Sequence, residues 1–156
     1  DEVVWSLADF VVAGTLLFGT VLTYVLVSRM TDSITYRAAV GIAVVTALLL
    51  VWINLAVGII GSEDNPANLM YIGVLAVGLI GALIARFRAH GMACAMIAMA
   101  LAQMLIAVIV LFAGFGSPES GPLQIIALNG LFAALFSGSA LLFRKAAHGG
   151  AERSAV

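Results

Sequence analysis

The charged residues of this chain are far apart, and five long stretches between them contain no Asp, Glu, Lys or Arg. These stretches cover residues 10–28, 38–62, 65–85, 89–118 and 120–143. A helix needs about 20 residues to cross the hydrocarbon core of a bilayer, and each stretch has about that length or more. Backbone amide and carbonyl groups in lipid must pair within the chain, so a helix is the expected form of each stretch.

The sequence therefore predicts an all-α, polytopic membrane protein. We expect a single bundle in residues 1–147, with five transmembrane helices at about 7–30, 35–60, 66–87, 91–115 and 122–145, followed by a tail at 148–156. The composition agrees, because 63% of the 156 residues are apolar and 10% are charged, which excludes a soluble globular domain and a disordered chain. Seven basic against eight acidic residues leave no positive surplus for nucleic acid.

In this layout every basic residue falls on one side of the bilayer. The basic side holds Arg29, Arg37, Arg86, Arg88, Arg144, Lys145 and Arg153, and the opposite side holds Asp1, Glu2, Asp9, Glu63, Asp64 and Glu119. The positive-inside rule then places the N-terminus outside and the C-terminus, with its tail, in the cytoplasm. Six Arg residues to one Lys, with much Ala, Gly and Val, suggest a GC-rich bacterial genome and hence a bacterial inner membrane.

The segments between the hydrophobic stretches carry residues that begin helices. Ser6 and Asp9 form an S-x-x-D capping box, and Ser33 is placed to cap the second helix. Pro66 and Pro122 stand in the first turn of the third and fifth helices, where the backbone amide has no helical partner and proline is tolerated.

Four polar residues follow the second stretch at close spacing: Glu63, Asp64, Asn65 and Asn68. Acidic groups are favoured beside the positive end of a helix, so capping is the first interpretation of this loop. The alternative is contact with an external cation, because closely spaced oxygen ligands bind hard cations. The spacing does not match an EF-hand loop.

Three amide side chains interrupt the hydrophobic stretches. Gln103 is expected near the membrane midplane, and Asn54 and Asn129 in the outer half. An unpaired amide in lipid is costly, so we expect all three to point into the bundle. They either bond between helices and fix their register or, together with Ser137, line a polar pocket or path that opens outward.

Small residues form faces on three of the predicted helices, taken at 100° per residue. They are Ala43, Ala47, Asn54, Gly58 and Gly61 in the second helix; Gly78, Gly81, Ala82 and Ala85 in the third; and Ala127, Gly130, Ala134 and Gly138 in the fifth. Small residues let helix backbones approach closely, which promotes association in lipid. We expect these to be packing faces, within the bundle or against other subunits.

The fourth helix carries a narrow stripe of methionines, Met92, Met96 and Met99, which continues to Gln103. Thioethers bind Cu(I), but methionine also fills irregular gaps in any apolar core. No His lies in the stripe, and Cys94 falls on the opposite face. Packing is therefore the preferred interpretation, a metal site is the weak alternative, and no cofactor is predicted.

Two aromatic residues, Trp52 and Tyr71, are candidates for a groove that binds a lipid or a quinone, although aromatics also gather at membrane interfaces for ordinary reasons. The histidines, His90 and His148, lie at or beyond the helix ends, so a b-type haem is not expected. No Ser–His pair or acidic dyad falls at one membrane depth, so we do not expect an enzyme. The sequence is compatible with a bound lipid.

The stretch from Trp52 to Tyr71, WINLAVGIIGSEDNPANLMY, resembles a segment of small bacterial inner-membrane proteins of no known activity. The resemblance covers the predicted second to fourth helices. It implies a multi-pass bacterial membrane protein and carries over no functional residues.

Three functions fit these features. The first is a non-enzymatic structural or accessory subunit that packs through small-residue faces into a homo-oligomer or a larger membrane complex. The second is a small transporter or channel for a polar solute or ion, with a path lined by Asn54, Gln103 and Asn129. The third is a lipid- or quinone-binding protein. A water-accessible cavity that reaches Asn54 and Asn129 from outside would favour transport, whereas a dry, mutually bonded cluster would argue against it.

Overall fold

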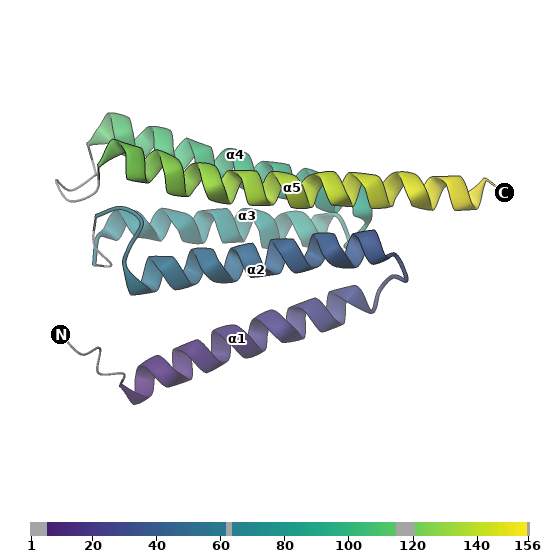
Figure 1. Cartoon of the computed structure of the whole chain (residues 1–156), viewed down its shortest axis with the longest axis horizontal. Helices are drawn as coiled ribbons and strands as arrows, with labels where there is room; N and C mark the ends of the chain where they lie inside the picture. Colours follow the sequence, from purple (N-terminus) through teal and green to yellow (C-terminus); the bar gives the residue numbers. More distant parts are fainter. Residues whose placement is uncertain (1–5, 62–63, 115–120, 156) are drawn as a thin grey trace.

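The computed structural model describes residues 6–61, 64–114 and 121–155, and within these ranges it is helical without strands (Figure 1). The helices are α1 (Leu7–Ser28), α2 (Ile34–Ala56), the short 3-10 helix η1 (Pro66–Leu69), α3 (Met70–Ile84), α4 (Ala89–Ala113) and α5 (Pro122–Ser154). Counting η1 with α3, the described part of the chain has five helices that are long and apolar enough to cross a membrane. The all-α prediction is confirmed.

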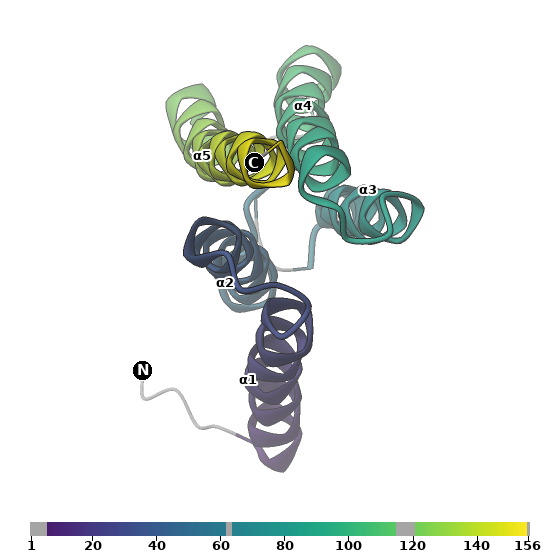
Figure 2. The same cartoon turned by 90° about the vertical axis from the view of Figure 1, so that its right-hand side faces the viewer.

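The helices form an open arch with a loosely attached first helix. Figure 2, which views the molecule along the helices, shows α3, α4, α5 and α2 arranged around a curve, with α1 projecting away from the others beside α2. The closest packing is between α4 and α5, and α5 also packs on α2. Three phenylalanines of α5, Phe132, Phe136 and Phe143, are fully buried in this core. In α1, by contrast, 6% of the most apolar window is buried.

The helices begin where the sequence predicts. Ser6 and Asp9 form a complete capping box, in which the Ser6 amide donates to the Asp9 carboxylate at 2.7 Å. The Ser33 hydroxyl accepts a bond from the Tyr36 amide at the start of α2. Pro66 and Pro122 stand in the first turns of η1 and α5. These caps satisfy amides that a helix start would otherwise leave unpaired.

Two helix ends differ from the sequence prediction. We expected the second helix to reach residue 60, but α2 ends at Ala56, because Gly58 and Gly61 adopt left-handed backbone angles with φ of 74° and 75°. The chain past Ala56 therefore folds as a loop, and these two glycines are not part of a helical stripe. At the other end of the chain, α5 continues to Ser154 rather than ending near 145. Residues 148–154, expected as a tail, extend this helix.

A tight turn joins α3 to α4. Arg86 and Phe87 both have positive φ, 49° and 57°, which is rare for residues other than glycine. The Tyr36 hydroxyl of α2 donates to the Phe87 carbonyl and so ties this turn to the bundle. A Cβ added at Gly91 would lie 2.5 Å from the Ala85 Cβ, so glycine is what allows α4 to start this close to α3.

Candidate functional site

The structure brings Gln103 and Asn129 together in a buried polar cluster with Tyr71. Asn129 Oδ1 accepts two bonds, from Gln103 Nε2 at 3.0 Å and from the Tyr71 hydroxyl at 3.1 Å. Asn129 Nδ2 donates to the Ile125 carbonyl at 2.9 Å. The two amides are 0% exposed and Tyr71 is 1% exposed. This cluster joins α3, α4 and α5, and it fixes their register because a shift of one helix would leave polar groups unpaired.

Asn54 does not join this cluster. Its Nδ2 donates to the Asn68 carbonyl at 3.0 Å, which ties the last turn of α2 to η1. The Asn68 side chain accepts bonds from the amides of Ile59 and Ile60 at 3.2 and 2.9 Å, so it holds the loop that follows α2. The three amides, for which a shared path was the alternative interpretation, therefore belong to two separate hydrogen-bonded groups.

Tyr71 stands between the two groups. A hollow of about 480 Å³ lies beside the end of α2 and the start of α3, and Asn54, Asn68 and Tyr71 border it. Two amide oxygens, Asn54 Oδ1 and Gln103 Oε1, are buried without a hydrogen-bond partner among the described residues. The Tyr71 hydroxyl is bonded to Asn129, so this one side chain both borders the hollow and belongs to the buried cluster.

Ser137, predicted to line a polar pocket with the amides, lies on the exposed face of α5. The buried hydroxyl of this helix is Ser139, which is 0% exposed and donates to the Ala39 carbonyl of α2 at 2.8 Å. Sequence reasoning missed Ser139. The spacing of Phe132, Phe136 and Phe143 could have identified it, because position 139 falls on the same helix face as these aromatics.

Of the four polar loop residues proposed to contact a cation, Glu63 lies outside the described residues. Asn65 caps η1, since its Oδ1 accepts a bond from the Ala67 amide at 3.0 Å. Asn68 Oδ1 is used by two backbone amides, and Asp64 borders the hollow beside α2. The amide oxygens in this loop thus act as caps for the backbone. Among the described residues there is no group of three or more His, Cys, Asp or Glu that could hold a metal.

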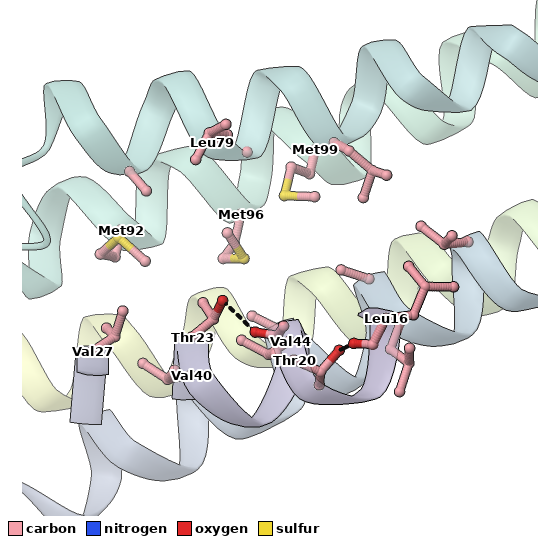
Figure 3. Close-up of a pocket in the computed structure, with 18 of the residues that line it drawn as sticks. Leu16, Thr20, Thr23, Val27, Val40, Val44, Leu79, Met92, Met96 and Met99 are labelled. Atoms are coloured by element: carbon pink, nitrogen blue, oxygen red, sulfur yellow. Dashed lines mark hydrogen bonds between the residues drawn. The ribbon is translucent and has the colours of Figure 1, made fainter. Parts of the chain in front are cut away.

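The methionine stripe lines a cleft of about 410 Å³ between α1 and α2 on one side and α3 and α4 on the other. Figure 3 shows Met92, Met96 and Met99 pointing into this cleft opposite residues of α1 and α2. The hydroxyls of Thr20 and Thr23, which also line it, donate to carbonyls within α1. The cleft is therefore apolar, and the thioethers form part of its wall.

The small-residue faces of α3 and α5 have different environments. On α3, Gly78 and Gly81 contact α4, because a Cβ added there would lie 2.4 Å from Met99 Sδ and 2.8 Å from the Ala95 Cβ. On α5, by contrast, Cβ atoms added at Gly130 and Gly138 would meet nothing within 4 Å among the described residues. The α3 face is a packing face within the bundle, as predicted, and the α5 face points outward.

The two aromatic candidates for a lipid or quinone groove are also separated. Tyr71 is buried and bonded to Asn129. Trp52, on α2, is half-buried and is not among the residues that border the hollow beside Tyr71. The cleft lined by the methionines is an apolar cavity that neither aromatic borders.

Comparison with protein-family models, with curated proteins and with solved structures found no match for this chain.

Proposed function

We propose that this protein is a non-enzymatic integral membrane protein, a structural or accessory subunit that associates with a second copy of itself through the outward face of α5. We place it in a bacterial inner membrane with the N-terminus outside and the C-terminus in the cytoplasm, because the basic residues gather at one end of the bundle. The observation that supports this most is the stripe Gly130, Ala134 and Gly138, which repeats a small residue every four positions: Ala134 is exposed, and a Cβ added at either glycine meets no described residue within 4 Å.

This face has the shape that helix association in lipid requires. Ala127, Ala134 and Ser137 are exposed beside the two glycines, so a partner backbone can approach closely. Leu131 lies beside the stripe and Leu141 follows it on the same face, and they are 53% and 64% exposed, so large side chains stand next to the groove. A ridge and a groove on one helix are self-complementary about a two-fold axis, the commonest symmetry of homo-oligomers.

The arrangement of the amides favours this function over transport. A path for a polar solute would need Asn54, Gln103 and Asn129 to face one water-filled space. Instead Asn129, at 0% exposure, accepts bonds from Gln103 and Tyr71 at Oδ1, and Asn54 is bonded to the η1 backbone. Bonds of this kind support a role in fixing helix register.

Cysteine crosslinking in membranes tests the proposal. Cys94 is first replaced by alanine, and Ala134→Cys or the matched control Ala76→Cys is then introduced; both alanines are exposed, on α5 and α3 respectively. Disulfides form where Cα atoms approach within about 7 Å. We expect oxidation to give a covalent dimer for Ala134→Cys at dilutions where Ala76→Cys gives none. Equal crosslinking of the two variants, or none at position 134, would contradict the proposal.

A further inference from the structure

A basic hollow of about 740 Å³ lies at the end of the bundle where the α1–α2 and α3–α4 connections meet α5. Four cationic side chains line it: Arg86, Arg88, Lys145 and Arg153. The carboxylates on its wall are Asp32 and Glu152. Asp32 Oδ1 lies 4.0 Å from the guanidinium of Arg37, a residue that does not line the hollow. Within the described ranges, none of the four cationic groups forms an ion pair with a carboxylate. The hollow therefore has a surplus of unpaired positive charge.

The backbone adds to this positive potential. The hollow is lined by the residues that begin α4, and the N-cap of that helix, Arg88, makes no side-chain cap bond with the described residues. The first amides of a 25-residue helix thus carry the positive end of its dipole toward the hollow. The turn at Arg86 and Phe87, tied down by Tyr36, holds the two arginines at this helix start. Positive side chains and a helix N-terminus together make a site for an anion.

The basic hollow adjoins the apolar cleft, and Phe87 lines both. In three other places, a residue that lines the cleft is only three or four positions from one that lines the hollow. These pairs, with the cleft residue first, are Val27 and Met30, Val40 and Tyr36, and Met92 and Ala89. From this junction the cleft follows α2 as far as Val51, a rise of about 16 Å at 1.5 Å per residue. The two cavities lie end to end, one cationic and one apolar.

We propose that these two cavities bind one anionic phospholipid, with the headgroup phosphate in the basic hollow and an acyl chain along the cleft. The depth is suitable, because α5 is charge-free up to Phe143 and becomes basic at Arg144 and Lys145, as expected where a hydrocarbon core meets headgroups. Basic pockets between transmembrane helices recognise anionic headgroups in this way. Free phosphate would fill the hollow and leave the cleft empty. The site is complete within one chain, so it does not depend on the dimer.

Native mass spectrometry of the full chain in detergent measures lipid binding and tests whether the basic hollow binds the headgroup. The probes are phosphatidylglycerol, phosphatidylcholine with the same acyl chains, and inorganic phosphate. We expect phosphatidylglycerol to bind more tightly than phosphatidylcholine. In the triple variant Arg86→Gln, Arg88→Gln, Lys145→Gln, the affinity for phosphatidylglycerol should fall about fivefold for each charge removed. Arg144→Gln is the matched control, because Arg144 is next to Lys145 but does not line the hollow.

A variant that fills the cleft tests whether the cleft binds the acyl chain. Ala47→Phe projects a ring into it, and Ala76→Phe places the same ring on the exposed face of α3. We expect Ala47→Phe to weaken both lipids and Ala76→Phe to weaken neither; Ala47→Leu gives a smaller loss of the same sign if the phenylalanine disturbs folding. The proposal is overturned if Arg144→Gln weakens binding as much as the triple variant. It is equally overturned if free phosphate displaces phosphatidylglycerol while the cleft variants bind normally, since the ligand would then be phosphate alone.

Discussion

Glycines at regular helical spacing occur on α3 and on α5, yet they have different surroundings. On α3, Gly81 lies against Ala95 of α4 so closely that a methyl group would clash. On α5, Gly130 and Gly138 have open space where a side chain would be, as far as the described residues show. The same sequence pattern thus marks an internal contact on one helix and an unoccupied face on the other.

The difference follows from what the opposite face of each helix carries. The inner face of α5 holds three large aromatics, Phe132, Phe136 and Phe143, and the polar groups of Asn129 and Ser139. Aromatic side chains bring many packing contacts, and buried polar groups require partners, so this face turns into the bundle. In α3, where such a set is absent from the 15 residues of the helix, the glycine face packs instead. Small-residue spacing therefore indicates close approach without indicating the partner.

The largest effect is expected where a glycine is already in contact. Gly81→Leu would force α3 away from α4, because the Ala95 Cβ and backbone cannot rotate aside, and it should lower the free energy of unfolding by about 3 kcal/mol. Gly78→Leu should cost less, since the nearest atoms belong to the flexible end of Met99. Unfolding of the full chain by SDS in mixed micelles measures both. Gly138→Leu, measured at dilutions where the chain is monomeric, is the control, with a change within about 0.5 kcal/mol; an equal loss there would remove the distinction between the two stripes.

The second prediction compares the stability effects of substituting two neighbouring residues on opposite faces of α5. Asn129→Ala leaves Gln103 and the Tyr71 hydroxyl without their shared acceptor, so we expect a loss of about 2 kcal/mol in the same SDS titration. Gly130→Ala, one residue away on the outer face, should cause no loss of monomer stability. If the two substitutions have the same effect, the buried cluster does not hold the helices in register.

The third prediction is a smaller loss of stability, and it compares two serines of α5. Ser139→Ala removes the bond to the Ala39 carbonyl and should cost about 1 kcal/mol. Ser137→Ala, on the exposed face, should leave the unfolding midpoint unchanged. A loss at Ser137 equal to that at Ser139 would show that the outer face of α5 is already packed in the monomer.

Much of the fold could be predicted from the sequence because charge-free stretches of sufficient length have few alternatives to helices. The helix starts were equally readable, since Ser6, Ser33, Pro66 and Pro122 act locally. The end of α2 was not, because hydropathy continues through residue 60 while two left-handed glycines end the helix earlier. The extension of α5 was missed for the opposite reason: polar residues end a membrane span without ending a helix.

The candidate sites were less predictable because they depend on which helices meet. That Gln103 and Asn129 would pair could be expected from the cost of a buried amide, but the separation of Asn54 depends on the loop that Asn68 organises. Arg86, Arg88 and Lys145 could be read as topology signals. Their place around one hollow follows from the α3–α4 turn and the extension of α5, neither of which is visible in a hydropathy pattern.

The central claim is that the free stripe on α5 is an interface between copies, and the most direct measurement is dimer affinity in lipid bilayers. Energy transfer between labelled full-length chains is followed as lipid dilutes the protein, for the wild type, Gly130→Leu and the matched control Gly73→Leu. Both glycines have open space around an added Cβ within the described part of the chain, but only Gly130 lies on the stripe. We predict that Gly130→Leu abolishes concentration-dependent transfer while Gly73→Leu keeps the wild-type dissociation curve. Identical curves for all three proteins would contradict the account.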